Sequence, residues 1–413
     1  MLLLTSQTGF GNDWHMTKPL LIIIGLACAV ISTAGCSTTT DATETPKPVP
    51  QPQQKQDKAS KEEVKELIAK LNDPNINVRR AAAGALGRSG AREAIPELIK
   101  LLSDTDVSMR HIAVISIKIM QVKEAIPDIK RLLSDPDGEV RRSAISTLEE
   151  LQGKEALPNI IKALSDPEAK IRYHAIILVM KLKAKEAIPD LLRLLSDPDD
   201  MVREMAARVL DTLQGKEAIP DLMKLLSDPY PTVRSSAITT LRELKAKESI
   251  PDIIRLLSDP AAEVRQSAAT ALGKLGAKEA VPDLIKLLSD SNANVRYVTV
   301  SALGILKAKE AIPQITGLLS DSDTKVRSHT IMALGRLQVK EAIPDIIKLL
   351  SDSDVDVRFA AVLALGELQA KEAIPDILKL LSDPDKKARK PAEHALKQLG
   401  VPEEEIQKAK EGK

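Results

Sequence analysis

The chain has 413 residues, enough for two or three ordinary domains or for one extended array. Its 59 Lys and Arg residues nearly balance 58 Asp and Glu residues, and this formal net charge of +1 excludes the basic surface expected of a nucleic-acid-binding protein. Apolar residues make up 43% of the chain but aromatic residues only 1%, which predicts thin, regular helix layers with an aliphatic core.

The N-terminal segment has the pattern of an export signal. Residues 16–36 read MTKPLLIIIGLACAVISTAGC, in which Lys18 precedes an apolar run of 12 residues, Leu20 to Ile31. Such a run is too short to span a membrane comfortably and is typical of a signal peptide. Residues 1–15 fit no signal pattern, so Met16 is the better start.

The end of this segment resembles a bacterial lipoprotein signal, because small residues lead to Cys36. The resemblance implies that residues 1–35 are removed and that Cys36 is lipidated, with Ser37 favouring sorting to the outer membrane. One departure is Thr33, where lipoprotein signals usually carry an aliphatic residue. The alternative is cleavage after Ala34, with Ser32 and Ala34 as the small-residue pair, which predicts a secreted or periplasmic protein.

Residues 36–60 are expected to tether the next domain to the membrane. Beyond Cys36 the segment is rich in Thr, Pro and Gln and almost lacks apolar side chains, so it cannot bury enough surface to fold. Both cysteines, Cys28 and Cys36, lie in the first 36 residues, so we expect the folded part to contain no disulfide and no cysteine metal ligand.

From residue 62 onward the chain repeats itself every 31 residues. Proline recurs at this step from Pro96 to Pro375, arginine from Arg79 to Arg389, and aspartate from Asp73 to Asp383. A fixed period between 20 and 50 residues is typical of solenoids. The sequence therefore predicts about eleven copies over residues 62–402.

One copy, residues 185–215, reads KEAIPDLLRLLSDPDDMVREMAARVLDTLQG. Its first half has apolar residues at helical spacing, with Pro189 in the first turn where it does not break the helix. Asp197 is expected to cap the second helix, which carries an apolar stripe from Val202 to Leu213. Each copy is thus a helical hairpin that must stack on its neighbours to bury its apolar faces.

The two ends of the array look like caps. Ser60 and Glu63 form a capping-box pattern before a charged first helix, and residues 403–413 (EEEIQKAKEGK) form a polar closing segment. Terminal repeats of solenoids need such polar outer faces.

The repeat resembles the HEAT-repeat family, in the short version first named from phycobilin lyases. Residues 280–306, AVPDLIKLLSDSNANVRYVTVSALGIL, match the motif AIPxLxxLLSDxDxxVRxxAxxALGxL well. The resemblance covers about 340 residues. It implies an all-α, right-handed α-solenoid whose second helices line the concave side, and it implies no chemistry, because function lies in sites placed on folds.

The recurrent Asp and Arg are interpreted as framework, since a residue present in every copy serves what every copy shares. We expect them to join turn and helix, within a repeat or between neighbours, by charge-assisted hydrogen bonds. Representative members of this structural ladder are Asp166, Arg172, Asp197, Arg203, Asp290 and Arg296.

The position after the arginine is the candidate binding position. A helix turns about 100° per residue, so this residue points nearly opposite to the small and aliphatic side of the second helix. The repeats hold four aromatics, and three of them fall here. Together with apolar residues on the same stripe, the predicted partner-binding residues are Tyr173, Ile177, Met180, Tyr297, Met332, Phe359 and Leu363. The alternative is that the helix leans and half-buries this position.

The sequence gives little support for catalysis or metal binding. Deoxyhypusine hydroxylase, a HEAT-type oxidoreductase, holds iron with His-Glu pairs after the arginine, and this sequence contains no His-Glu dipeptide. The histidines of the repeats, His111, His174, His329 and His394, lie in separate repeats, too far apart to share an ion. Phycobilin-lyase activity is cytoplasmic pigment chemistry and does not fit an exported chain.

The sequence thus predicts a non-enzymatic scaffold without a cofactor, anchored by lipid at the outer membrane and facing the periplasm. It is expected to bind protein or peptide partners, and no nucleic acid, on its concave side. The enzyme alternative is an oxidoreductase of the deoxyhypusine hydroxylase kind or a phycobilin lyase.

Overall fold

The computed structural model describes residues 60–411. The predicted signal peptide, Cys36 and all but the end of the tether lie outside these residues. Within them the chain is helical and forms no strand, which confirms the predicted all-α solenoid class. No helix in this range is long and apolar enough to cross a membrane.

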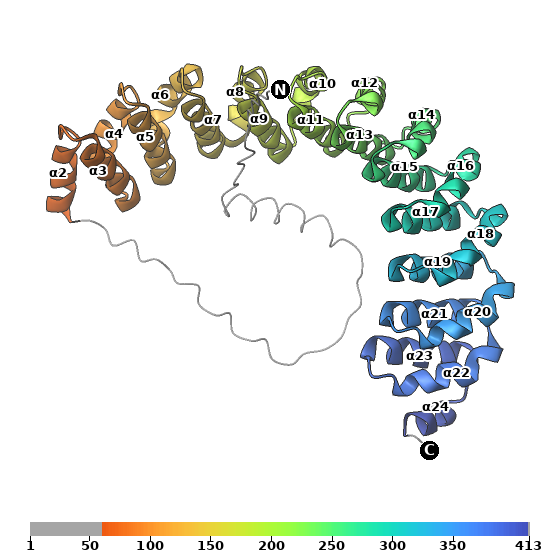
Figure 1. The fold of residues 1–413 in the computed structure, drawn as a ribbon. Helices are drawn as coiled ribbons and strands as arrows, with labels where there is room; N and C mark the ends of the chain where they lie inside the picture. Colours follow the sequence, from red (N-terminus) through yellow and green to blue (C-terminus); the bar gives the residue numbers. More distant parts are fainter. Residues whose placement is uncertain (1–59, 412–413) are drawn as a thin grey trace, which may run out of the picture. The chain divides into compact units, whose positions relative to one another are not determined.

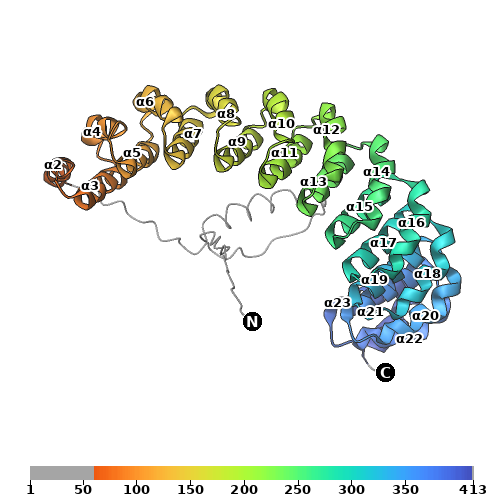
Figure 2. The same cartoon turned by 45° about the horizontal axis from the view of Figure 1, so that its top comes forward.

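The described residues form a stack of eleven helical hairpins in two layers. We number the repeats 1 to 11 and call the first helix of each hairpin helix A and the second helix B. The A helices form the outer layer and the longer B helices the inner, concave layer (Figures 1 and 2). The B helices therefore lie where the resemblance implies.

The A helices, in order of repeat, are α2 (Lys61–Lys70), α4 (Ile95–Leu101), α6 (Ile126–Arg131), α8 (Leu157–Ala163), α10 (Ile188–Leu194), α12 (Ile219–Lys224), α14 (Ile250–Arg255), α16 (Val281–Lys286), α18 (Ile312–Gly317), α20 (Ile343–Lys348) and α22 (Ile374–Lys379). The B helices are α3 (Ile76–Ser89), α5 (Val107–Met120), α7 (Gly138–Gln152), α9 (Ala169–Leu182), α11 (Asp200–Thr212), α13 (Pro231–Glu243), α15 (Ala262–Leu275), α17 (Ala293–Leu306), α19 (Thr324–Arg336), α21 (Val355–Glu367) and α23 (Lys386–Gln398).

Short 3₁₀ turns flank the A helices. One kind precedes helix A: η1 (Arg92–Ala94), η2 (Lys123–Ala125), η4 (Gly153–Ala156), η5 (Lys185–Ala187), η6 (Lys216–Ala218), η8 (Lys247–Ser249), η10 (Lys278–Ala280), η12 (Lys309–Ala311), η14 (Lys340–Ala342) and η16 (Lys371–Ala373). The other kind follows it: η3 (Leu132–Ser134), η7 (Leu225–Ser227), η9 (Leu256–Ser258), η11 (Leu287–Ser289), η13 (Leu318–Ser320), η15 (Leu349–Ser351) and η17 (Leu380–Ser382).

The expected cap of helix B is wrong by two residues. In repeat 5 the N-cap is Asp199, whose carboxylate accepts from the Val202 N–H, while Asp197 lies two residues earlier. The physical reason is that the Asp197 carboxylate is already engaged by the guanidinium of Arg172 from the preceding repeat, at 2.7 Å. The Asp197 carboxylate instead accepts from the Asp199 N–H at 3.0 Å, and this bond shapes the turn before the helix.

The Arg–Asp ladder runs between repeats as well as within them. Arg203 donates from Nη1 to the carbonyl of Asp197 at 2.7 Å and to that of Pro198 at 3.1 Å, both in its own repeat. Its Nε and Nη2 donate to the carboxylate of Asp228, in the next repeat, at 2.7 and 3.0 Å. One guanidinium therefore fixes its own turn and the distance to its neighbour.

Nine such Arg–carboxylate pairs follow one another through the described residues, from Arg110–Asp135 to Arg358–Asp383. Burial opposes the ionisation of Asp290, but hydrogen bonds from Arg265 and the Asn292 N–H outweigh it and lower the pKa of this carboxyl. The same balance, with the arginine of the preceding repeat as donor, lowers the pKa of Asp135, Asp321, Asp352 and Asp383.

Glycines let adjacent B helices approach closely. An ideal Cβ on Gly273 of α15 would lie 2.9 Å from the Cα of Ala302 in α17, closer than such atoms come. Gly304, Gly335 and Gly366 also face alanines of the following B helix, at the longer distances of 3.3, 3.2 and 3.5 Å between an added Cβ and the alanine Cβ. In repeats 2 to 6 larger residues occupy this position, and Glu149 there is 7% exposed and pairs with Lys181 at 2.8 Å.

Both ends of the stack are closed by charged helices. The predicted capping box is confirmed, since the Ser60 hydroxyl accepts from the Glu63 N–H and the Glu63 carboxylate accepts from the Ser60 N–H. At the other end α24 (Glu403–Lys410) buries Ile406 against the core. The core, which forms one cluster from Leu102 to Ile406 and a second from Val64 to Met109, consists almost wholly of Leu, Ile, Val and Ala, as the composition predicts.

The ladder yields a stability prediction. We expect Arg203→Ala to lower the free energy of unfolding by about 3–5 kcal/mol, because it leaves the buried Asp228 carboxylate without its guanidinium. The matched control is Arg389→Ala in repeat 11, where the arginine binds the carbonyls of Asp383 and Pro384 but, within residues 60–411, no carboxylate. Its loss should be about 1–2 kcal/mol in the same urea titration. Equal losses would contradict a role for the inter-repeat pair.

The glycine contact yields a second prediction. Gly273→Ala should destabilise the protein by about 1–3 kcal/mol, because the added Cβ meets the backbone of the next helix. Gly317→Ala is the control, since an added Cβ on this residue of α18 meets nothing within 4 Å and should raise stability by about 0.5–1 kcal/mol. Thermal unfolding of both variants tests the pair, and a stabilised Gly273→Ala protein would refute the close contact.

Candidate binding surface on the inner helix layer

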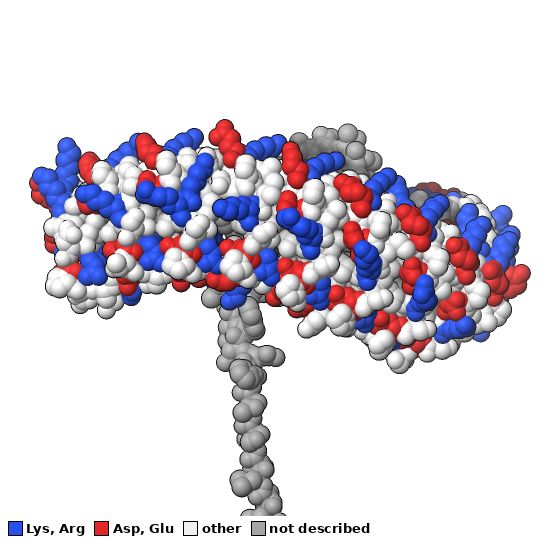
Figure 3. Space-filling model, turned by 90° about the horizontal axis from the view of Figure 1, so that it is seen from above, with Lys and Arg blue, Asp and Glu red and all other residues white. Residues whose placement is uncertain are grey.

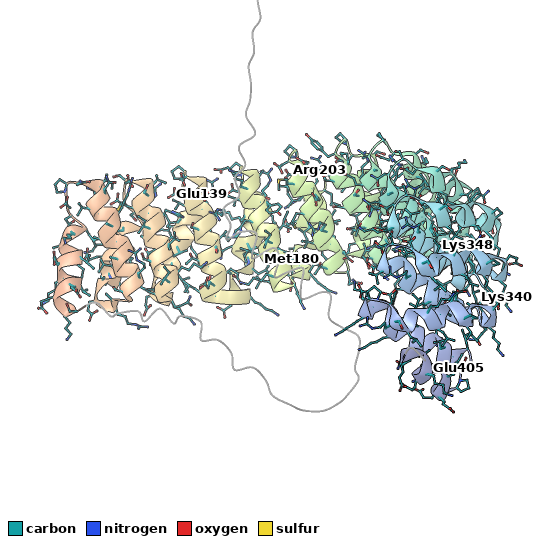
Figure 4. The ribbon with its side chains drawn as sticks, turned by 60° about the horizontal axis from the view of Figure 1, so that its bottom comes forward. Glu139, Met180, Arg203, Lys340, Lys348 and Glu405 are labelled. Atoms are coloured by element: carbon teal, nitrogen blue, oxygen red, sulfur yellow. The ribbon has the colours of Figure 1, made fainter. Side chains whose placement is uncertain are left out.

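The predicted binding residues lie on the B helices of the inner layer. Tyr173, Ile177 and Met180 belong to α9, and the other four belong to α17, α19 and α21. In Figure 4 Met180 and the ladder residue Arg203 lie at opposite edges of the B-helix layer. Tyr173 and Tyr297 directly follow the ladder residues Arg172 and Arg296, so the candidate surface begins next to the ladder and extends along the B helices away from it.

The residues of the first patch, in α9, are half-buried. Tyr173 and Met180 pack against the hydrophobic core with part of their surface, and Ile177 is buried to a similar degree. Burial raises the pKa of the Tyr173 phenol, which therefore stays neutral. The helix leans as the sequence-based alternative stated, so this patch offers the partly exposed sides of its residues rather than whole side chains.

The second patch spans three neighbouring B helices. The Tyr297 ring of α17 packs beside the His329 ring of α19, with centroids 4.8 Å apart and planes tilted by 44°. Met332 of α19 packs against the core, and Phe359 and Leu363 of α21 are half-buried. These residues come from repeats 8 to 10, where glycines bring the B helices close together.

The sequence analysis did not identify three isoleucines that are exposed in the structure. Ile115 and Ile119 of α5 are 39% and 50% exposed, and Ile305 of α17 is 51% exposed. Ile115 lies five residues after Arg110, on the stripe already identified, so the repeat alignment could have found it. Ile119 and Ile305 lie nine residues after their arginines, and only the lean of helix B shows that this position faces solvent.

The histidines occupy unrelated environments. His174 is largely buried, and its Nε2 has no hydrogen-bond partner among the described residues. Burial, assisted by the nearby positive charges of Arg142 and Lys118, lowers the pKa of His174 to about 4, so the ring is neutral at pH 7. His329 contacts Tyr297, and His394 lies 3.0 Å from the Gln398 amide.

Residues 60–411 contain no group of three or more His, Cys, Asp or Glu side chains that could hold a metal ion. On the outer layer, most A helices pair an acidic residue with a Lys or Arg one turn later, as in Asp345–Lys348 at 2.7 Å. Figure 3 shows the two signs of charge interspersed over this face. The outer layer is thus locally neutralised, and the inner layer carries the apolar surface.

The inner layer carries an apolar surface. It consists of half-buried aromatic and aliphatic side chains on the B helices, and the uncharged His174 follows Tyr173 on α9. Such surfaces bind partners by burying apolar area around a few anchor residues.

The fold is found in solved structures of large solenoids. The chain is similar to a Kap121p mutant (TM-score 0.59, 14% identity, 83% of this chain and 46% of that one) and to importin beta (TM-score 0.58, 16% identity, 84% and 57%). It is also similar to Kap121p bound to Nup53p (TM-score 0.58, 13% identity, 83% and 45%). At these identities the likeness concerns the fold alone, and the chain spans about half the length of these proteins. None of the curated proteins matches the sequence.

The family model of HEAT repeats matches residues 64–149, 129–211, 189–262, 250–324 and 312–397. These overlapping segments cover most of the chain and nearly all of its described part. With the helical hairpins, the recurrent Arg–Asp ladder and the two-layer stack, they place this chain in the HEAT-repeat family.

Proposed function

We propose that this chain is a HEAT-repeat scaffold that binds protein or peptide partners on its inner layer and has no catalytic activity. The observation that carries the proposal is the presence of Tyr297, Met332, Phe359 and Leu363 on three adjacent B helices, with exposed Ile305 further along α17. In a chain with 1% aromatic residues, this concentration on one face favours a binding surface over chance. The similar solenoid Kap121p binds a protein, Nup53p, which supports the same class of ligand.

We further propose that the scaffold is exported and lipid-anchored at Cys36 in the outer membrane, facing the periplasm. The support is the sequence pattern of residues 16–36, followed by a segment of the composition of a tether. The proposed role of that segment is to set how far from the membrane the inner layer can engage a partner.

Partner binding can be tested by substitution on the second patch. A photo-crosslinker at Ile305 identifies the partner in cells, and affinity is then measured with purified proteins. We expect Tyr297→Ala with Phe359→Ala to weaken binding about tenfold or more, because both rings would lose buried contact area.

The control for this experiment is Tyr230→Ala. Tyr230 is 49% exposed but lies at the start of α13, before the ladder arginine and outside the stripe. Its substitution should change affinity less than about threefold. Unchanged binding by the Tyr297 and Phe359 variant would remove the support for this surface.

Lipid anchoring predicts a defined mature N-terminus. We expect mass spectrometry of the protein from membranes to find Cys36 as the first residue, carrying a diacylglycerol. Cys36→Ser should leave the precursor unprocessed and without lipid. An unmodified N-terminus at Gly35 would show that cleavage follows Ala34 and that the protein is not lipid-anchored.

A further inference from the structure

A pocket of about 310 Å³ lies between the outer helices of repeats 3 and 4. Its rim consists of Asn159 and Lys162 of α8 and of Ser134 at the end of η3. Its inner part reaches Ile145 and Ile171 of the B helices beneath. The volume is at the lower end of the range for small-molecule pockets.

The lining of the pocket includes the position at which repeat 4 lacks a leucine. Ala163 occupies a position that is leucine in the other repeats from 2 to 11: Leu101, Leu132, Leu194, Leu225, Leu256, Leu287, Leu318, Leu349 and Leu380. Several of these leucines are buried to more than nine-tenths. Shortening this side chain to a methyl group opens the outer layer down to the helix-B residues.

The comparable groove between repeats 7 and 8 shows the difference. It has a volume of about 400 Å³, but only residues of the A helices and their 3₁₀ turns line it, Leu287 among them, and it does not reach the B helices. Its rim carries the ion pair Asp283–Lys286 at 2.8 Å. Repeat 4 differs from this arrangement at two positions, because Ala163 replaces the leucine and Asn159 replaces the acidic residue of the ion pair.

The rim of the repeat 4 pocket carries a positive charge without a partner. Eight A helices pair an acidic residue with a Lys or Arg three positions later. In α8 the acidic residue is replaced by Asn159, and Lys162 has no ion-pair or hydrogen-bond partner among the described residues. Repeat 9 also lacks the pair, but Gly317 leaves no cation there.

The other charges in the pocket wall are already neutralised. Arg141 holds the Asp166 carboxylate at 2.8 and 2.9 Å and also binds Glu168 at 3.0 Å. Asp135 is held by Arg110 at 2.7 and 2.8 Å. Lys162 therefore supplies the attraction for an incoming anion, and Asn159 adds an amide donor beside it.

We propose that this pocket binds a short, branched aliphatic carboxylate. The aliphatic group fills the space that leucine occupies in the other repeats, and the carboxylate replaces the missing acidic partner of Lys162. A free branched-chain acid and the C-terminal leucine of a peptide share this chemistry. The site lies in the outer layer and is independent of the proposed partner surface on the inner layer.

The test is isothermal titration of the full chain with 4-methylpentanoate and, as the uncharged counterpart, 4-methylpentanamide. We expect a dissociation constant on the order of 1 mM for the acid and binding of the amide at least about fivefold weaker. Acetyl-Gly-Gly-Leu and its C-terminal amide form a second pair that distinguishes a peptide terminus from a free acid as the ligand. Tighter binding of either acid than of its amide supports the site.

Two variants restore the residues of the other repeats and so should fold. Ala163→Leu fills the floor, should raise the melting temperature by a few degrees, and should weaken acid binding about tenfold or more. Asn159→Asp supplies Lys162 with a partner and should bring acid and amide within about twofold of each other. Gln314→Asp, the same change in repeat 9, is the control and should alter neither affinity.

The proposal is overturned if neither acid binds saturably to the full chain. It is also overturned if Ala163→Leu, shown to be folded by its melting temperature, binds the acids as the natural sequence does.

Discussion

The structure depends on one arginine that is used twice in repeats 2 to 10. Its Nη1 holds the carbonyls of its own turn, and its Nε and Nη2 hold the carboxylate of the next repeat, as Arg172 does with Asp166 and Asp197. Each ladder aspartate belongs to the turn of its own repeat and is bound by the arginine of the repeat before it. The turn therefore cannot change its conformation without changing the distance between the two repeats. A buried pair of this kind adds little net stability compared with an apolar contact, but it fixes geometry closely. The regular stack follows from that constraint.

The contacts between adjacent B helices differ along the stack, although the Arg–Asp ladder recurs. In repeats 7 to 10 a glycine faces an alanine of the next repeat, so the helices approach closely, as Gly273 does with Ala302. In repeats 2 to 6 charged or long residues stand at the same position, among them Glu149 and Met180. Burial of Glu149 is tolerated because Lys181 of the following helix pairs with it. The second aromatic patch lies on the part of the layer where these glycines bring the helices close together.

Repetition explains how much could be predicted from the sequence. Each hairpin was visible because Pro189 and its equivalents mark a helix start and the apolar stripe marks the buried face. The cap at Asp199 was missed because Asp197 competes for the same role and only its pairing with Arg172 shows how it is used. The left-handed backbone of Lys307 and Gln338 after helix B, with φ of 55° and 57°, was also invisible, because such residues are uncommon in that conformation. Gln338 donates its side-chain amide to the Gly335 carbonyl three residues earlier, which is a local contact at the end of helix B.

The same reasoning separates framework from candidate sites. A residue shared by all repeats, such as Arg172, is explained by the stack, and any function must come from positions where one repeat departs from the rest. Tyr297 departs by being aromatic on the inner layer, and Ala163 departs by leaving a gap in the outer layer. A departure alone is weak evidence, because most surface changes are neutral. Ala163 and Asn159 are stronger evidence because both line the same pocket. Each also lacks a stabilising contact that other repeats have, such as the Asp283–Lys286 ion pair.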